Sequence, residues 1–347
     1  MDNCRVAIVG ATSLMGEELV RVLEQRNFPL ASLQLYAADG TAGRTVYAAH
    51  HAYIVQPIEH SSDRSSFKDT DLVFFIGADD ISRHLIPQAM RLGATVIDNS
   101  TVYRMEPDVP LIVPEVNMAE AENHRGIIAC PDCSTIILNV VLNPLHKHNP
   151  IKKAIISTYQ SVSGMGLAAM SELTLQSQQV LAGDIPRPQF FPHEIGFNIL
   201  PQVDVFLDNG YTREEWHLLD ETRKIMHNSE ILISATCVRV PTFKGHCMAL
   251  TLEFTGNINR DKAGDILAEA PGVRVMDDTT INLYPQPRTA AGTDTVLVGR
   301  IRQDVFNDKG LVMFVAADNI RKGAALSMAQ IAEEINKKGW LKAKGRR

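Results

Sequence analysis

A glycine-rich turn near the N-terminus constrains the fold of this chain more than any other sequence feature. Residues Gly10 to Gly16 read G-A-T-S-L-M-G and directly follow the apolar run Arg5 to Val9. The segment from Met15 to Gln25 then shows helical spacing of apolar residues. Glycines let the backbone approach a pyrophosphate, and the start of a helix offers N–H donors and a partial positive charge. A glycine pair alone often marks only a strand–helix turn, but this context predicts a dinucleotide-binding turn.

The first 130 residues alternate between strand and helix patterns. Further short apolar runs are predicted to be strands: Leu33 to Ala37, Leu72 to Phe75 and Thr95 to Ile97. A helix pattern lies between the last two runs and ends at Gly93. Alternating strands and helices favour a parallel sheet with crossover helices, and therefore a Rossmann-type domain.

The pattern changes after residue 130. A helix is predicted behind Pro131, and longer apolar strands follow: Ala154 to Thr158, Ile231 to Val240, Met248 to Phe254, Val296 to Ile301 and Leu311 to Ala316. Such strands favour a mixed or antiparallel sheet in an α+β domain. A last helix is expected over Ala324 to Ile335. We therefore expect an α/β protein with one domain at residues 1–130, completed by a terminal helical segment at 323–347, and a second domain at 131–322.

Charge and cysteine content limit the partners and the compartment. The chain has 34 Lys and Arg against 40 Asp and Glu, which gives no general attraction for nucleic acid or anionic lipid. No apolar run reaches the ~18 residues that span a membrane, and the residues after Met1 do not resemble a signal peptide. Five cysteines without an export signal favour the reducing cytoplasm. An anionic substrate would need local basic residues.

Cys133 stands in C-P-D-C-S-T, where a helix is predicted to begin. A helix N-terminus stabilises a thiolate and lowers the pKa of the thiol, and a thiolate is the form that attacks an aldehyde. A small core residue, a zinc ligand and a reversible disulfide with Cys130 are the alternatives. Zinc needs four ligands and no second C-x-x-C follows, so we expect no metal site.

A second group of candidate residues reads Arg239-Val-Pro-Thr-Phe-Lys-Gly-His246. Arg239 offers a planar fork for a carboxylate. A turn at Gly245 would let His246 project into a cleft as a general acid or base. Taken alone, a strand arginine followed by a loop histidine is also compatible with structural roles.

Several longer stretches together resemble the aspartate-semialdehyde dehydrogenase family over nearly the whole chain. The stretches are V-P-E-V-N (113–117), C-P-D-C-S-T-I (130–136), S-T-Y-Q-S-V-S-G (157–164), D-N-G-Y-T (208–212), A-T-C-V-R-V-P (235–241), V-G-R-I-R (298–302) and A-D-N-I-R-K-G-A-A (317–325). The resemblance implies NADPH-dependent reductive dephosphorylation of aspartyl phosphate to aspartate semialdehyde through a cysteine thioester. It also implies a place in lysine, methionine, threonine and diaminopimelate synthesis, and a homodimer formed through the second, catalytic domain.

The resemblance also assigns roles to residues of this chain. Cys133 matches the nucleophile, His246 the acid or base, and Gln160 the glutamine that orients the substrate. Substrate-binding positions match Arg239 for the carboxylate, Glu221 for the ammonium, and Lys224 and Arg104 for the phosphate. Ser100 matches a further substrate-binding position. Cofactor-binding positions match Gly10, Thr12, Ser13, Leu14, Met15, Gly16, Ala38, Thr41, Ser163, Gly164 and Asn319.

The chain departs from the family pattern at four places. Ser13 stands where glycine is usual in the family. Asp39-Gly40 replaces the pair of a small residue and an arginine that binds the NADP phosphate. Asp79 and Asp80 are expected in a loop near the pyrophosphate, and Asp132 replaces asparagine before Cys133. Asp39 favours NAD whereas Arg44 could serve NADP, so both cofactors stay open. A paralogue with altered or lost activity and a related acyl-phosphate reductase are the alternative functions.

Overall fold

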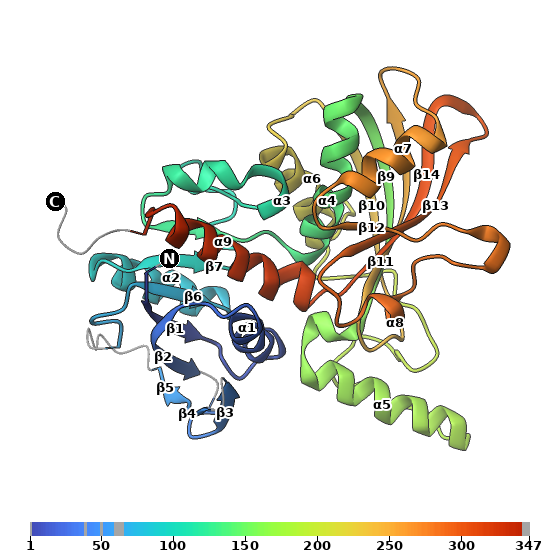
Figure 1. Cartoon of the computed structure of the whole chain (residues 1–347). Helices are drawn as coiled ribbons and strands as arrows, with labels where there is room; N and C mark the ends of the chain where they lie inside the picture. Colours follow the sequence, from blue (N-terminus) through green and yellow to red (C-terminus); the bar gives the residue numbers. More distant parts are fainter. Residues whose placement is uncertain (1, 38–39, 49–50, 59–65, 342–347) are drawn as a thin grey trace. The chain divides into compact units, whose positions relative to one another are not determined.

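The computed structural model describes the chain except residues 1, 38–39, 49–50, 59–65 and 342–347 (Figure 1). The chain divides into two compact units, here called unit 1 and unit 2. Unit 1 is Met1–Pro131 with Ala324–Arg347, and unit 2 is Asp132–Gly323. Among the described residues, no helix combines the length and apolar character needed to cross a membrane.

Unit 1 contains a six-stranded parallel sheet, as the alternating pattern predicts. Its order is β5-β2-β1-β6-β7-β8, and every described pair in it is parallel. The strands are β1 (Cys4–Val9), β2 (Leu30–Ala37), β5 (Gln56–Pro57), β6 (Leu72–Phe75), β7 (Thr95–Asp98) and β8 (Ile127–Ala129). Strands β6 and β7 are buried throughout because both faces of the sheet are covered. The predicted Rossmann-type fold is confirmed.

Helices α1 (Leu14–Gln25), α2 (Asp79–Arg91) and α9 (Leu326–Lys337) belong to unit 1. Although α9 is distant in sequence, it packs against α1, beside which it lies in Figure 1. The short α3 (Pro114–Asn117) and the hairpin of β3 (Thr45–Ala48) and β4 (His51–Ile54) complete this unit. Our placement of Asp79 and Asp80 in a loop was wrong. They form the first turn of α2, where negative charge is favourable.

Unit 2 contains a six-stranded mixed sheet of order β10-β9-β11-β14-β13-β12. Strand β10 is parallel to β9, whereas β11 is antiparallel to both β9 and β14. The strands are β9 (Ile151–Gln160), β10 (Leu232–Arg239), β11 (His246–Phe254), β12 (Val273–Val275), β13 (Val296–Asp304) and β14 (Asn307–Ala317). The helices are α4 (Cys133–His148), α5 (Leu167–Ala182), α6 (Arg213–Ile225), α7 (Arg260–Glu269) and α8 (Pro287–Ala290). The predicted mixed sheet is confirmed.

The glycine-rich turn between β1 and α1 is so closely packed that there is no room for a Cβ at Gly10 or Gly16. Gly10 has φ +87°, and a Cβ there would lie 1.7 Å from the carbonyl oxygen of Ile76. A Cβ on Gly16 would lie 2.3 Å from the Gly10 carbonyl oxygen. Ser13 is the N-cap of α1, since its Oγ accepts a hydrogen bond from the Gly16 N–H and donates one to the Gly10 carbonyl. Ser13 therefore has a local structural role at a position where the resemblance leads one to expect glycine.

The substitution Gly10→Ala is expected to destabilise the protein by about 2–5 kcal/mol. A left-handed backbone conformation and overlap with a main-chain oxygen both oppose a side chain at this position. Urea denaturation would measure the loss. The matched control is Gly77→Ala, since a Cβ at Gly77 meets no atom within 4 Å. Equal stability of the two variants would contradict the packing argument.

Candidate active site

The predicted nucleophile Cys133 is the first residue of α4, and Asp132 is the N-cap of that helix. The Asp132 carboxylate accepts a hydrogen bond of 2.8 Å from the Ser134 N–H. The Asp132 N–H donates to Glu221 Oε2 at 2.9 Å. Aspartate is among the best N-cap residues. Asp132 therefore fixes the start of the helix that carries Cys133, with one carboxylate oxygen engaged in the cap.

The pKa of the Cys133 thiol moves opposite to our prediction from the helix N-terminus. Burial and the carboxylates of Asp132 and Glu214 raise the pKa well above its usual value, whereas Arg239 lowers it. The helix begins where the sequence predicts it, but desolvation and two nearby acids outweigh its dipole. Burial and the two acids therefore disfavour the thiolate form of Cys133.

Gln160, the last residue of β9, lies in a buried polar network. Its amide Nε2 donates to Ser134 Oγ at 3.0 Å and to Glu214 Oε1 at 2.6 Å. The Ser134 hydroxyl also donates to Glu214 Oε1, at 3.0 Å. The network therefore joins β9, the first turn of α4 and the first turn of α6.

His246 is the first residue of β11 and is buried. Its Nδ1 accepts a hydrogen bond of 3.2 Å from the Ser161 N–H and lies 3.1 Å from Ser161 Oγ. A backbone N–H can only donate, so we place the imidazole proton on Nε2. Burial and then Arg239 lower the pKa of His246 to about 3. A neutral imidazole with Nε2–H as donor is therefore the resting form.

Asn319 holds together the loops around His246. Its Oδ1 accepts hydrogen bonds from Ser161 Oγ and Ser163 Oγ, both at 3.2 Å, and from the Gly245 N–H at 3.1 Å. Its Nδ2 donates to Ser163 Oγ at 3.1 Å. Asn319 and Ser163, predicted to contact the cofactor, thus lie in one network with the predicted acid or base.

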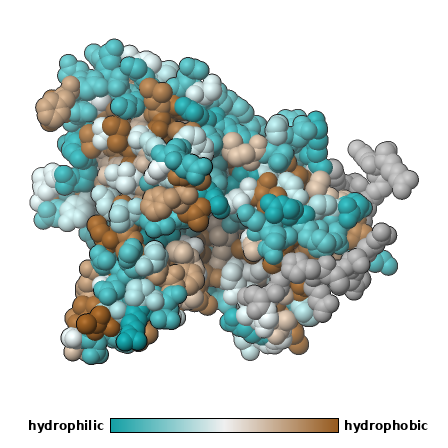
Figure 2. Space-filling view, turned by 180° about the vertical axis from the view of Figure 1, so that it is seen from behind, coloured by the Kyte–Doolittle hydropathy of each residue, from teal (hydrophilic) through white to brown (hydrophobic). Residues whose placement is uncertain are grey.

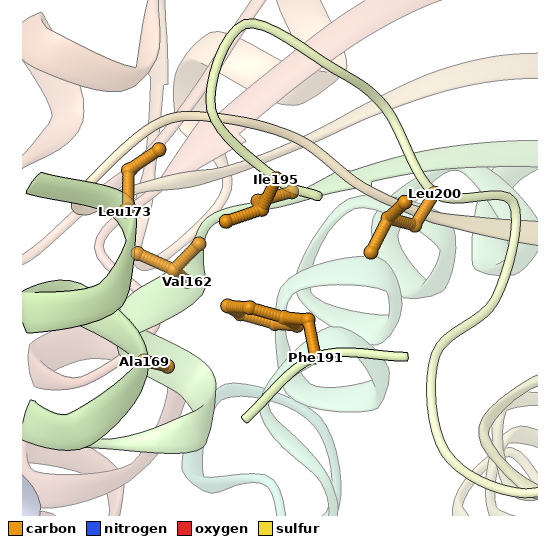
Figure 3. Close-up of a cluster of buried hydrophobic side chains, with 6 residues drawn as sticks. All are labelled: Val162, Ala169, Leu173, Phe191, Ile195 and Leu200. Carbon is orange, nitrogen blue, oxygen red and sulfur yellow. The ribbon is translucent and has the colours of Figure 1, made fainter. Parts of the chain in front are cut away.

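Apolar packing fixes the same loop from its other side. Figure 3 shows Val162 pointing into a buried cluster with Phe191, Ile195 and residues of α5. The full cluster is Val162, Ala169, Leu173, Phe191, Ile195 and Leu200. Since Val162 lies between Ser161 and Ser163, this core sets the position of the hydroxyls that contact Asn319.

Arg239 and His246 face the same glycine. A Cβ on Gly164 would lie 3.3 Å from Arg239 Nη1 and 3.4 Å from His246 Nε2. Arg239 ends β10, is buried, and donates from Nη1 to the Ser161 carbonyl at 2.8 Å. Within the described part of the chain, Arg239 Nε and His246 Nε2 have no hydrogen-bond partner. Buried donors without partners are costly, so this arrangement favours a bound polar ligand.

The other candidate substrate residues lie in two places. Glu221 and Lys224 lie on α6, where Glu221 is fully buried and Lys224 partly buried. Ser100 and Arg104 belong to unit 1. Ser100 Oγ donates to Asp98 Oδ2 at 2.6 Å, and Arg104 Nη2 donates to the Asn99 carbonyl at 2.8 Å.

The candidate cofactor residues of unit 1 surround the glycine turn. Thr12 Oγ1 and Thr41 Oγ1 are 2.6 Å apart, whereas Leu14 and Met15 begin α1. Ala38 and Asp39 lie outside the described residues. The described part of the chain contains no group of three or more His, Cys, Asp or Glu that could hold a metal ion.

Ser134, Ser161 and Glu214 were not predicted from the sequence. Two signals pointed to Ser161 and Glu214. Polar residues flank the end of the apolar strand in S-T-Y-Q-S, and a second acid follows the helix start in T-R-E-E. Both patterns are also typical of solvated surfaces, so residue spacing alone could not distinguish buried site residues from exposed ones.

Comparisons with known proteins agree on one family. The family model "Semialdehyde dehydrogenase, NAD binding domain" matches residues 5–124, and "Semialdehyde dehydrogenase, dimerisation domain" matches residues 142–322. Aspartate-semialdehyde dehydrogenase of Aquifex aeolicus is 46% identical over 340 residues, which cover 97% of this chain and 99% of that protein. The Bacillus subtilis protein of that name is 41% identical over 344 residues, covering 96% and 97%.

Solved structures give the same result. Aspartate semialdehyde dehydrogenase II from Vibrio cholerae superposes with a TM-score of 0.92 at 38% identity, covering 96% of this chain and 99% of that chain. A structure of that protein complexed with ASA also gives 0.92, at 37% identity and with 96% and 98% covered.

The low pKa of His246 predicts a specific dependence of stability on pH. The unfolded chain binds a proton near pH 6.5 that the folded chain binds only near pH 3. The contribution of this group to the free energy of unfolding is therefore complete above pH 6.5 and is lost as the pH falls from 6.5 toward 3. Between pH 6.5 and 5 the loss is about 2 kcal/mol.

Urea denaturation at pH 7 and pH 5 would measure this loss in the native protein and in His246→Asn. The asparagine variant should lose less stability between the two pH values, by about that amount. Replacement of the exposed His193 by asparagine is the control and should keep the native slope. If His246→Asn loses as much stability between pH 7 and pH 5 as the native protein does, this imidazole is not the source of the loss.

Proposed function

The chain belongs to the aspartate-semialdehyde dehydrogenase family, and from this premise we propose that it reduces L-aspartyl 4-phosphate to L-aspartate 4-semialdehyde with NADPH and releases phosphate. The observation that carries the proposal is the pair of buried donors without partners, Arg239 Nε and His246 Nε2, in two side chains that both face Gly164. Arg239 also acts on the pKa of Cys133. In this proposal a nucleophile, a guanidinium and a proton donor act together in unit 2.

The reaction proceeds through a thioester on Cys133. The sulfur attacks the acyl carbon, the carbon–oxygen bond to phosphate breaks, and phosphate leaves with the proton that the thiol gives up. When bound, the nicotinamide would supply a hydride to the thioester carbon. His246 Nε2–H would then donate a hydrogen bond to the oxygen as it becomes negative. The carbon–sulfur bond breaks to release the aldehyde and a Cys133 thiolate, which takes up a proton from water. The resting tautomer, fixed by the Ser161 N–H, suits this order of events.

Different residues bind the carboxylate, the ammonium group and the phosphate of the substrate. Arg239 takes the α-carboxylate through its remaining N–H groups, since Nη1 is already held by the Ser161 carbonyl. Glu221 takes the ammonium group. Lys224, Arg104 and Ser100 bind the phosphate, and Gln160 orients the reacting carbon beside Cys133.

Unit 1 binds the cofactor in this proposal. The turn from Gly10 to Gly16 holds the pyrophosphate, and the hydrogen-bonded Thr12 and Thr41 lie beside it. Ser163, Gly164 and Asn319 of unit 2 contact the nicotinamide end. Arg44 Nη2 lies 3.5 Å from Glu17 Oε1, an exposed pair of little energetic value that a 2′-phosphate can displace. NADP is therefore the proposed cofactor.

The proposed assembly is a homodimer formed by the open face of the unit 2 sheet. Exposed apolar side chains on this face include Ile155, Tyr159 and Leu232, whereas the alternate residues of β9 and β10 are buried on the other face. The exposed large hydrophobic residues near the end of α5 are Leu175, Val180, Leu181 and Ile185. In Figure 2 the end of the α5 region shows hydrophobic residues among hydrophilic ones. The five cysteines, all within the described residues, are not joined by disulfides, and we propose the reducing cytoplasm as the compartment.

Phosphate-dependent cofactor reduction at 340 nm tests the proposed function in the reverse direction. Protein, aspartate semialdehyde and phosphate should reduce NADP, with NAD compared in a parallel reaction. Cys133→Ala should abolish turnover and keep the fold. Cys4→Ala, which removes a buried thiol in unit 1, should retain turnover. A folded protein that reduces neither cofactor would favour a paralogue with another task.

Arg239→Lys is expected to raise the KM for aspartate semialdehyde about 10- to 100-fold. An ammonium group cannot make the parallel hydrogen bonds that a guanidinium makes to a carboxylate. Steady-state kinetics would measure the change, with the exposed Arg302 replaced by lysine as the control. An unchanged KM for Arg239→Lys would place the carboxylate elsewhere.

A further inference from the structure

Glu214 occupies a central place that the proposed mechanism does not use. It is the second residue of α6, and its side chain is buried. Its Oε1 accepts hydrogen bonds from the Gln160 amide at 2.6 Å and the Ser134 hydroxyl at 3.0 Å. Ser134 directly follows Cys133 at the start of α4. Glu214 is thus the common acceptor that links the orienting glutamine to the helix turn carrying the nucleophile.

The charged and titratable groups around Glu214 come from each element of the network. Asp132 and Cys133 belong to the start of α4, and Cys237 and Arg239 to β10. Burial and then the Asp132 carboxylate raise the pKa of Glu214 to about 8, against the lowering effects of Gln160, Ser134 and Arg239. Glu215 follows on the same helix, and its carboxylate accepts from the Thr212 and Cys237 N–H groups.

We propose that Glu214 is a positioning residue for the reaction proposed above, which as an uncharged carboxylic acid holds Gln160 and Ser134 in place beside Cys133. The inference rests on that proposed function. Asp132 already places one carboxylate at the cap of α4. A second ionised carboxylate beside it would oppose both a Cys133 thiolate and an anionic substrate.

The proton on Glu214 therefore offsets the replacement of asparagine by Asp132. With Glu214 neutral, the carboxyl keeps its acceptor oxygen for Gln160 and Ser134 and adds no charge. With Glu214 ionised, the same hydrogen bonds remain, but the site gains a buried negative charge. Activity should accordingly fall as the pH rises through about 8.

Glu214→Gln separates position from charge, because glutamine keeps the acceptor oxygen and cannot ionise. We expect turnover within about threefold of native at pH 7. The native protein should lose activity above about pH 8, and the glutamine variant should not. Glu214→Ala removes the acceptor and should lower kcat/KM about 10- to 100-fold at pH 7. Glu215→Gln, which alters the neighbouring buried carboxylate that caps α6, should keep the native alkaline loss.

Alkylation of Cys133 by iodoacetamide, followed by mass spectrometry from pH 7 to 10, gives a readout without turnover. The Glu214→Gln thiol should react about three- to tenfold faster than the native thiol at pH 9, because no second carboxylate forms beside it. Identical alkylation curves, or a glutamine variant as impaired as the alanine variant at pH 7, would overturn the proposal. If the native protein reduces no cofactor, the proposed function fails, and the alkylation curves still decide whether Glu214 ionises beside Cys133.

Discussion

One buried oxygen, Oδ1 of Asn319, holds the predicted catalytic histidine in place. It accepts hydrogen bonds from Ser161, Ser163 and the Gly245 N–H, which lie in the loop after β9 and in the turn before β11. Buried donors without an acceptor cost about 1–3 kcal/mol each. The loop and the turn therefore keep their positions only while this amide stays between them. Ser161 in turn fixes the tautomer of His246, so the direction of proton donation depends on the same contact.

A second constraint acts at the start of α4. The backbone geometry places Cys133 at the first helical position, but burial and nearby acids oppose its ionisation. The fold therefore positions the nucleophile without activating it in the ligand-free state. Cationic groups such as Arg239 work against the acids, so reactivity depends on a balance of buried charges. This balance gives Glu214 its importance, since it is an acid that burial keeps uncharged.

The sequence was sufficient to predict both sheets, the first helix and the start of α4 at Cys133, because these depend on local patterns such as apolar runs and glycine spacing. Helices α5 and α6 were not predicted. Their buried faces include Glu172, Gln176, Glu214 and Glu221, which in a sequence resemble solvated residues. The Gln160–Glu214 contact joins residues 54 apart, and no local pattern reports such a pair. The pKa of Cys133 depends on these distant acids, so its direction was predicted wrongly.

The burial of this network has a consequence for the response of the protein to salt. Dissolved ions screen charges that they can approach, and at physiological ionic strength the screening length is about 8 Å. Arg239 is buried within unit 2, where mobile ions do not enter, and acts on the pKa of Cys133. Its effect on the thiol should therefore persist at ionic strengths that abolish exposed pairs such as Arg44–Glu17. Potassium chloride would then slow the capture of a charged substrate from solution while leaving the electrostatic balance at the sulfur unaltered.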